Sequence, residues 1–267
     1  MRRRDAAARD AARPSHAAPS SEPRVPMLGP ALAGAGAVAA AWVWSARRRV
    51  ARDTALHRVL IELLLNALSA GNASTERHSR RVADLADALY ATYHPTRAAH
   101  STLRLGALLH DMGKIDDRFF AIVHGREKLT PEQRAEMTGH PAESAHILKP
   151  LEPFHPGLLD IVRSHHERWD GHGYPRGLAG TAIPLEARVI TAADVFDALT
   201  QPRGYKAARP VDETLAELRR GSGALFDPDV VARVQRPEVV ARWRAIAAAG
   251  RAAEEAAAPV DVAATSR

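Results

Sequence analysis

Histidines and acidic residues gather in the middle of the sequence, and their order is the first sign of chemistry. Eleven of the 13 histidines lie between His78 and His172. The stretch HHERWDGHGYP, at residues 165–175, places two adjacent histidines and two acids beside a Gly-His-Gly-Tyr-Pro segment. Imidazoles and carboxylates bind divalent transition metals, and glycines let a backbone pass close to a ligand. The chain has no cysteine, so any metal must be held by nitrogen and oxygen atoms.

A second chemical feature is the pair His110–Asp111, which closes the apolar segment LRLGALLHDMGK. An imidazole and a carboxylate there can bind one cation, and the second oxygen of Asp111 can bridge to another. Adjacent residues on a helix point about 100° apart. His165 and His166 can therefore reach one metal together only if the end of their helix faces the site. Such ligands suit Mn, Fe, Co, Ni or Zn and argue against a purely structural zinc cluster.

The elements that must position these groups are expected to be helices. Apolar residues recur at spacings of three and four, and no alternating pattern indicates a strand. The second helix has one apolar face, formed by Val82, Leu85, Ala86 and Leu89. The third is expected to end near Gly113. The expected helices are 55–68, 74–90, 96–114, one starting at Thr130 with Pro131 and Gln133 in a capping box, 157–168, 185–199, 211–220, and 228–245 with Asp227 and Pro228 at its start.

The two ends of the 267-residue chain differ from this helical middle. Much of the formal net charge of +6 comes from N-terminal arginines, so it says little about chemistry downstream. Residues 1–24 are expected to form a disordered basic leader, and residues 249–267 a disordered tail. Residues 25–46 carry no charge and would extend about 33 Å as a helix. Three arginines follow them, which fits either a transmembrane anchor or a flexible, Ala-rich linker.

Taken together, the motifs resemble those of the HD-GYP family, a branch of the HD metal-dependent phosphohydrolases. An HD pair alone is common, whereas HD with a following lysine, HHExxDGxGYP and a later DxFDALT in this order is specific. The resemblance covers about residues 55–245 and implies an all-α, HD-type helical bundle with a buried binuclear metal site, assigned to residues 53–248. The matching segments are HSRRV at 78–82, LLHDMGK at 108–114, GHP at 139–141, HHERWDGHGYP at 165–175, RVITAADVFDALT at 188–200 and FDP at 226–228.

The resemblance implies a metal-binding role for seven side chains. They are His78, His110, Asp111 and Asp194 for one ion, and Asp111, as the bridge, with His140, His165 and His166 for the other. Some family members hold a third metal with a glutamate four residues before the first motif histidine. This chain has Ser74 there, so two ions are expected rather than three.

Other matching residues are expected to contact the substrate or support the site. Lys114 would reach the scissile phosphate and act with Asp111 in catalysis, although the helix dipole alone also favours a lysine at a helix end. Tyr174, Arg203 and Lys206 match positions that contact the ligand's bases or phosphates; a packed tyrosine and solvated cations are the alternatives. Glu167 and Asp170 are expected to fix the loop or support the ligands rather than bind metal.

The resemblance implies a phosphodiesterase of second-messenger signalling. The family's usual substrate is cyclic di-GMP, which would be opened to pGpG and, in one alternative, cleaved on to GMP. Two divalent ions are expected as cofactors, with iron or manganese favoured and nickel, cobalt or zinc as alternatives. Two other functions stay open: hydrolysis of another nucleotide, such as a different cyclic dinucleotide, and a non-catalytic sensor that binds a nucleotide or a protein.

The expected surroundings of the protein follow from the same comparison. The catalytic domain would lie in a bacterial cytoplasm, anchored to the inner membrane if residues 25–46 span it. Expected partners are a cyclic dinucleotide, signalling proteins and a second copy of the chain in a homodimer. A nucleic acid polymer is not expected as a partner.

Overall fold

The computed structural model describes residues 59–66, 73–96, 100–116, 118–119, 122, 129–202 and 207–257. All of them belong to one compact unit, residues 58–267. The predicted leader and the charge-free segment 25–46 lie outside the described residues, as do the last residues of the predicted tail, 258–267. Within the part that is described, no helix combines the length and the apolar character needed to cross a membrane.

The described residues form an all-helical structure without strands, as predicted, and their only β-type pairings are isolated bridges. Short 3-10 helices, named η, separate several of the α-helices. The helices are residues 59–66, α2 (Ala73–Tyr90), α3 (Ser101–Leu109), η2 (Met112–Ile115), α5 (Pro131–Met137), α6 (His140–Ile147), η3 (Lys149–Leu151), α7 (Leu158–Arg163), η4 (Gly180–Ala182), α8 (Leu185–Thr200), α9 (Val211–Arg220), α10 (Pro228–Val234) and α11 (Pro237–Ala257).

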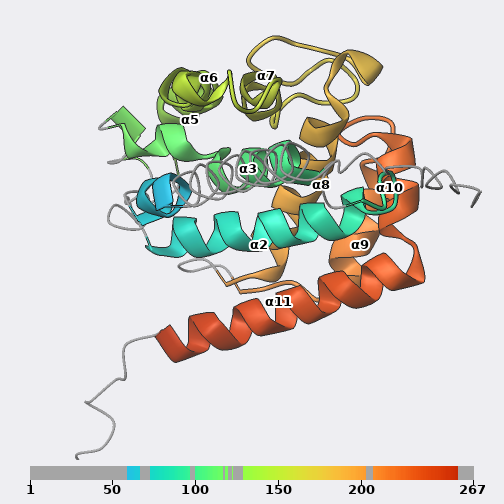
Figure 1. Ribbon diagram of the computed structural model, residues 1–267. Coiled ribbons are helices and arrows are strands. Elements are labelled where there is room, and N and C mark those ends of the chain that lie inside the picture. The colour runs from blue at the N-terminus through green and yellow to red at the C-terminus, as the bar shows by residue number, and fades with distance from the viewer. Residues whose placement is uncertain are drawn as a thin grey trace, which may run out of the picture. The chain divides into compact units, whose positions relative to one another are not determined.

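Helix α2 is the element on which the bundle is organised, because α3, α8 and α11 all pack along it (Figure 1). Its predicted apolar face is confirmed: Val82, Leu85, Ala86 and Leu89 are at most 1% exposed. Residues at spacings of three and four lie on one side of a helix, so this stripe can face the core along its whole length. The same spacing places His78 one turn before Val82, at the edge of that buried face.

The larger hydrophobic core joins α2 and α8 to the C-terminal helices. Trp243 of α11 is fully buried, and its ring centroid lies 4.6 Å from that of Phe196 in α8. Its indole N–H donates to the carbonyl oxygen of Leu85 over 3.0 Å. A buried indole needs such a partner, because an unpaired N–H would lose its hydrogen bond to water. Trp243 therefore attaches α11 to both α2 and α8.

Helix α3 contributes residues to two hydrophobic cores, and the His110–Asp111 pair follows directly after its last residue. Leu103 and Ala107 belong to the larger cluster, whereas Leu105 and Leu109 belong to a smaller one that includes Leu158 of α7. A short helix that is apolar on both sides is held firmly by its neighbours. The residues directly after it, His110 and Asp111, are thereby placed at a rigid, buried helix end.

Two predicted helix starts are confirmed by their capping hydrogen bonds. The Thr130 hydroxyl accepts the backbone N–H of Gln133 over 3.2 Å, and the Gln133 side chain accepts the N–H of Thr130 over 3.0 Å. At α10, the carboxylate of Asp227 accepts the N–H of Asp229 over 2.8 Å. These side chains satisfy amides that have no partner within the first turn of a helix.

Two helices near the histidines end earlier than predicted. Helix α3 ends at Leu109, and the 3-10 turn η2 follows instead of a continuous helix to Gly113. This tighter turn brings Gly113 against α6, where a Cβ atom would lie 2.4 Å from the carbonyl oxygen of His140. Helix α7 ends at Arg163 rather than at residue 168. His165 and His166 follow in a turn, so the end of the helix faces the other histidines. This is the arrangement that two adjacent residues need if both are to reach one metal.

The C-terminal region also departs from the prediction. The single helix expected at 228–245 is two helices, with a break before Pro237. Proline has no N–H to donate and disfavours helical geometry in the residue before it, so it begins a new helix at its first turn. Helix α11 then continues to Ala257. The prediction of a disordered tail from residue 249 onward is therefore wrong for residues 249–257.

Candidate metal centre

Three of the predicted histidines share one arrangement of ring hydrogen bonds. In His110, His140 and His165, Nδ1 lies 2.8, 2.6 and 2.6 Å from the backbone carbonyl oxygen of the residue three positions earlier. A carbonyl oxygen only accepts, so in the neutral ring Nδ1 carries the proton and Nε2 keeps its lone pair. The local helix or turn geometry thus orients each ring with an unprotonated Nε2 exposed to the centre of the cluster.

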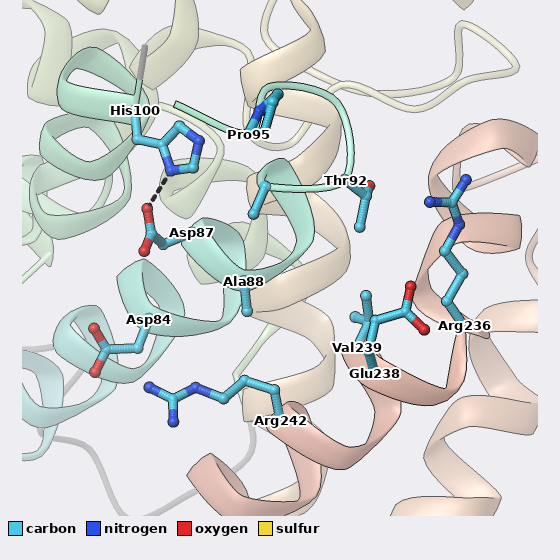
Figure 2. A pocket seen from close by; sticks show the side chains of 11 residues that line it. Asp84, Asp87, Ala88, Thr92, Pro95, His100, Arg236, Glu238, Val239 and Arg242 are labelled. Atoms are coloured by element: carbon cyan, nitrogen blue, oxygen red, sulfur yellow. Dashed lines mark hydrogen bonds and ion pairs between the residues drawn. The ribbon is translucent and has the colours of Figure 1, made fainter. Parts of the chain in front are cut away.

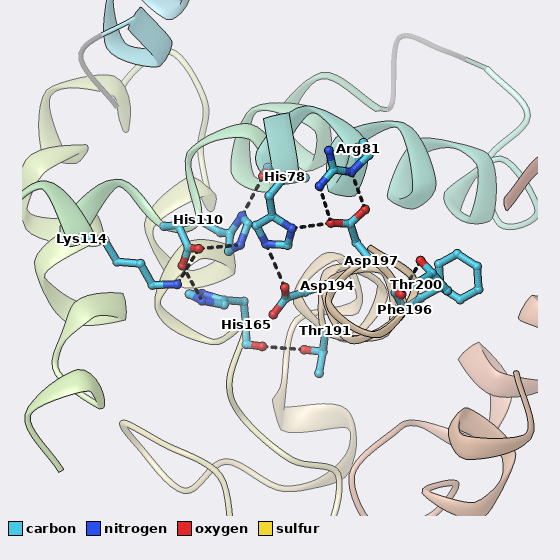
Figure 3. Close-up of polar contacts among 12 residues, drawn as sticks. His78, Arg81, His110, Lys114, His165, Thr191, Asp194, Phe196, Asp197 and Thr200 are labelled. Atoms are coloured by element: carbon cyan, nitrogen blue, oxygen red, sulfur yellow. Dashed lines mark hydrogen bonds and ion pairs between the residues drawn. The ribbon is translucent and has the colours of Figure 1, made fainter. Parts of the chain in front are cut away.

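His78 is oriented by side chains of α8 instead (Figure 3). Its Nδ1 lies 2.7 Å from Oδ2 of Asp197, and its Nε2 lies 3.0 Å from Oδ1 of Asp194. The other oxygen of Asp197 accepts Nε–H of Arg81 over 2.7 Å. Asp194 and Asp197 are three residues apart and share one face of α8. One helix face therefore supplies a carboxylate to each side of the His78 ring.

Asp111 lies between two groups of histidines, with one oxygen toward each. Oδ1 is 3.2 Å from Nε2 of His140 and 3.9 Å from Nε2 of His165. Oδ2 is 3.4 Å from Nε2 of His110 and 2.6 Å from Nζ of Lys114. A carboxylate with this placement has the geometry needed to bridge two cations.

The polar atoms in the centre of the cluster fit a metal better than they fit one another. His110 Nε2 and Asp111 Oδ1 are buried and make no hydrogen bond. His140 Nε2 and His165 Nε2 lie 3.3 Å apart, although the carbonyl contacts leave a lone pair on each. Facing lone pairs repel, and a cation between them removes the repulsion. Nitrogen and carboxylate donors of this kind suit divalent transition metals.

The candidate ligand atoms fall into two groups, within each of which they lie at most 4.8 Å apart. The grouping follows the predicted division of ligands between two ions, with Asp194 beside the first group through its contact with His78. The groups are His78, His110 and Asp111, and His140, His165 and His166.

Burial keeps His110, His165 and His166 neutral, because it lowers the pKa of each ring. It lowers the pKa of His110, places the pKa of His166 at about 3, and lowers that of His165 well below the usual range. Burial opposes ionisation of Asp111, but the neighbouring His110 and Lys114 outweigh it, and the pKa of this carboxyl lies well below its usual value. Neutral imidazoles and ionised carboxylates are the forms that bind metal.

Two of the four predicted substrate contacts, Lys114 and Tyr174, lie at the edge of the cluster. The ring centroids of Tyr174 and His166 are 4.9 Å apart. The Lys114 side chain is 22% exposed, so its ammonium can meet a ligand from solvent while it contacts Asp111. Arg203 and Lys206, the other two, lie outside the described residues.

Glu167 and Asp170 contact the loop that follows the paired histidines. The buried carboxylate of Glu167 accepts the backbone N–H of Arg176 over 2.7 Å and that of Leu178 over 3.0 Å. Asp170 accepts the N–H of His172 over 3.1 Å and the guanidinium of Arg168 over 2.6 Å. These hydrogen bonds fold the loop back on itself and so fix the position of Tyr174 within it.

Sequence reasoning missed two residues that orient His78. Asp197 is 1% exposed and lies between the His78 ring and the Arg81 guanidinium. A signal was present, because Asp197 follows Asp194 by three residues and Arg81 follows His78 by three, so each pair shares a helix face. The meaning of these spacings appears only when α2 packs against α8.

A hollow of about 790 Å³ between α2 and the start of α11 does not coincide with the cluster (Figure 2). It contains none of the seven predicted ligands. Its lining includes the carboxylates of Asp84, Asp87 and Glu238, which would repel the phosphates of a nucleotide, beside the cations Arg236 and Arg242. The buried histidine cluster is therefore the better candidate for phosphate chemistry.

Fold and site together define an all-helical protein whose buried histidines and aspartates can hold divalent metals. A protein family described as HD domain matches residues 58–230, more than half of the chain, and the chain belongs to this family. The match confirms the family indicated by the sequence motifs.

Characterised relatives carry related names. A 3′3′-cGAMP-specific phosphodiesterase 3 of Vibrio cholerae is 35% identical over 184 residues, which are 69% of this chain and 40% of that protein. A cyclic di-GMP phosphodiesterase of Thermotoga maritima is 36% identical over 172 residues, 63% of this chain and 46% of that protein. The chain thus spans less than half the length of these two relatives.

A solved structure shows the same fold. It is the cyclic GMP-AMP-specific phosphodiesterase V-cGAP3 of Vibrio cholerae, which aligns with a TM-score of 0.51 and 20% sequence identity. The alignment covers 72% of this chain and 53% of that chain.

Proposed function

We propose that this chain is a metal-dependent phosphodiesterase that hydrolyses a cyclic dinucleotide, with cyclic di-GMP as the first candidate. The observation that carries the proposal is Asp111, whose two oxygens face separate histidines at 3.2 and 3.4 Å. A bridging carboxylate between two imidazole groups is the ligand arrangement of a binuclear centre. The names of the relatives support a cyclic dinucleotide as the substrate.

In this proposal, seven side chains hold two divalent ions. The assignment follows the two groups of donor atoms and their burial, and it keeps the division expected from the motifs. Mixed imidazole and carboxylate donors are compatible with Fe, Mn, Co, Ni or Zn, with Fe or Mn as the first candidates. The ions are assigned to His78, His110, Asp111 and Asp194, and to Asp111, His140, His165 and His166.

The proposed reaction adds water to a phosphorus atom and breaks its bond to the 3′ oxygen, which leaves as a hydroxyl group. A cyclic di-GMP ring would become linear pGpG, and a second hydrolysis would release GMP. When bound, two divalent ions supply positive charge that lowers the pKa of water and offsets repulsion at the phosphate. Lys114 would stabilise negative charge on the phosphate, and the ring of Tyr174 would offer a surface for stacking a base.

The test is turnover by the full chain with Mn²⁺ or, without oxygen, Fe²⁺. Wild type, Asp111→Ala and the control Asp84→Ala are incubated with cyclic di-GMP, and linear products are measured by chromatography. Asp84 is a matched control, because it is an aspartate of α2 that pairs with Arg104 at 3.0 Å, away from the cluster. We expect loss of both bound metal and product only in Asp111→Ala. Full turnover by Asp111→Ala would contradict the proposal, and tight nucleotide binding without hydrolysis by the wild type would favour a sensor.

A second substrate, 3′3′-cGAMP, is favoured by the name of a relative at 35% identity. Both cyclic dinucleotides present the same phosphodiester to the metals, so discrimination must come from contacts to the bases. The ratio of kcat/KM for cyclic di-GMP and 3′3′-cGAMP, measured side by side, decides between them.

The extent of the catalytic unit, its attachment to a membrane and its partners are further parts of the proposal. We assign the catalytic unit to residues 53–248, extended by α11 to residue 257. Attachment of a cytoplasmic catalytic domain to the inner membrane by residues 25–46 stays a prediction, as do homodimer formation and binding of signalling proteins. Membrane fractionation of the full chain against a form lacking residues 25–46 tests the anchor, and light scattering tests the dimer.

A further inference from the structure

A chain of alternating charges leads from the candidate metal centre to the C-terminal helix. Asp197, between His78 and Arg81, is its first member. The guanidinium of Arg81 binds Asp197 through Nε at 2.7 Å and Nη2 at 3.1 Å, and it donates a third hydrogen bond, from Nη1, to Glu254 at 3.2 Å. Arg77 then donates to both oxygens of Glu254, at 3.0 and 2.7 Å. Two carboxylates and two guanidinium groups alternate, so their charges balance.

The local structure of α11 is shaped to allow this contact. Gly250 lies one turn before Glu254 and is buried against the stem of Arg81, where a Cβ atom would be 2.6 Å from Cδ. Any larger residue would displace the arginine. The Gln201 side chain, at the end of α8, donates to the carbonyl oxygen of Ala247 over 3.1 Å. Helix α11 is thus attached to α8 within one turn of the arginine.

We infer that Glu254 is a positioning residue for the metal centre: it holds Arg81, which holds Asp197, which orients the His78 ring. The inference rests on the proposed metal site. Helix α11 begins at Pro237, beyond the segment 58–230 that matches the HD domain family. Glu254 therefore supports the metal centre from a helix outside the matched segment. A guanidinium held at three of its five donors keeps one geometry, whereas one released from Glu254 can rotate away from Asp197.

The consequence concerns the Nδ1 proton of His78. Asp197 accepts a hydrogen bond from Nδ1 and so favours the tautomer with an unprotonated Nε2, the atom directed toward Asp194. Loss of Glu254 would leave Arg81 free to shift, and Asp197 with it. The metal affinity of the site should fall without any change in its ligands.

The experiment compares Glu254→Ala with Glu255→Ala in the full chain. Glu255 is the next residue of α11 and is exposed, so it controls for loss of a helix glutamate. Binding of Mn²⁺ is measured by electron paramagnetic resonance, and the His78 ring by NMR of metal-free protein with ¹⁵N-labelled histidine. Outer partners of metal ligands change affinity about 10- to 100-fold, so for this more distant residue we expect a drop of about threefold to tenfold. The Nδ1–H signal of His78 should broaden or divide between two tautomers.

Glu255→Ala should match the wild type in both measurements, and Glu254→Gln, which keeps an acceptor for Arg81, should show a smaller change than Glu254→Ala. If Glu254→Ala unfolds, the comparison is made on Glu254→Gln. Unchanged Mn²⁺ affinity together with an unchanged His78 signal in the Glu254 variants would overturn the inference. If the wild type takes up neither Mn²⁺ nor, without oxygen, Fe²⁺, the proposed metal site fails, and the His78 signal alone decides whether Glu254 positions the ring.

Discussion

At the scale of single residues, Gly113 shows how closely the HD turn, residues 110–115, is packed against helix α6. A Cβ atom there would lie 2.4 Å from the carbonyl oxygen of His140 and 2.7 Å from the backbone nitrogen of Ser144. The N–H of Gly113 also donates to the Ser144 hydroxyl over 2.7 Å. The obstructing atoms are backbone, so they cannot move away as a flexible side chain would. The distance between Asp111 and His140 therefore depends on the absence of a side chain at Gly113.

Gly113→Ala should destabilise the fold and disturb the metal centre. Forcing a methyl group into a packed site costs about 1–3 kcal/mol, and here the strain falls on the backbone of a proposed ligand. Urea unfolding and Mn²⁺ titration measure the two effects. Gly139→Ala is the matched control, since its Cβ would lie 3.2 Å from its nearest neighbour, the carbonyl oxygen of Glu136. Equal stability of the two variants would show that the HD turn is not tightly packed on α6.

A substitution at Lys114 distinguishes metal binding from phosphate hydrolysis. Its ammonium lies 2.6 Å from Asp111, yet it has no lone pair to offer a metal when protonated. Lys114→Ala should therefore retain bound metal but lose turnover, by about 100-fold or more if the lysine stabilises charge in the transition state. Metal content and kcat are measured on the same sample, with Lys149→Ala, an exposed lysine of η3, as the control. A variant with normal kcat would make Lys114 a surface cation near the site and nothing more.

At the scale of elements, the loop after the paired histidines is closed by one buried carboxylate. Glu167 is 2% exposed and accepts two backbone amides across the loop. The backbone also turns tightly here: a Cβ on Gly173 would lie 2.3 Å from the nitrogen of Arg168. Glu167→Ala leaves two inward amides without an acceptor, and hydrogen bonds to charged groups contribute about 1.5–3 kcal/mol each.

The loop in Glu167→Ala should therefore open locally, and Tyr174 should lose its place beside His166. Hydrogen exchange of amides in residues 171–180 should accelerate by about 100-fold, which corresponds to roughly 3 kcal/mol of local stability. The KM for cyclic di-GMP should rise. Glu167→Gln keeps one acceptor oxygen and should show part of the effect. Exchange in Glu167→Ala at the wild-type rate would mean that the backbone alone maintains the loop.

Helix boundaries were predictable wherever the signal was local. Helix α9 runs Val211–Arg220, as expected from residues 211–220, because Pro210 precedes it and Gly221 follows it. The predicted end of α3 was less accurate, because the 3-10 turn depends on contact between Gly113 and α6. The break before Pro237 did have a local signal, since proline disfavours helix in the residue before it. The break was not predicted, because apolar residues recur at helical spacing both before and after it.

The convergence of the candidate ligands was predictable from the sequence, and the residues that support them were less so. The motif order placed His110 and Asp111 among the candidate ligands, and the structure brings all seven candidates into one cluster or its edge. Asp197 and Arg81 were missed, because their three-residue spacing from Asp194 and His78 gains its meaning only when α2 packs against α8. Glu254 is farther still from any motif: it is 173 residues from Arg81, and only the packing of α11 on α2 brings them together.

At the scale of the whole molecule, the candidate metal centre brings together residues from several helices that also share the hydrophobic cores. His78 belongs to α2, the HD pair follows α3, His140 begins α6, and the paired histidines follow α7. Burying these polar groups without a metal costs free energy, because converging lone pairs and the unpaired oxygen of Asp111 replace contacts with water. A ligand that binds only the folded state stabilises it, by about 2.7 kcal/mol at a concentration 100 times its Kd.

Metal removal should therefore lower the melting temperature of the whole unit. For a domain of this size, about 1 kcal/mol shifts Tm by roughly 2–4 °C, so Mn²⁺ at saturating concentration should raise Tm by about 5–10 °C over protein treated with EDTA. Mg²⁺ at the same concentration is the ionic control, because it prefers oxygen ligands and should shift Tm little. In Asp111→Asn the shift with Mn²⁺ should fall toward zero, whatever the Tm of the metal-free variant. A wild-type Tm that is the same in Mn²⁺, Mg²⁺ and EDTA would show that these histidines fold together without a metal, and the cluster would then be a structural core rather than a binuclear centre.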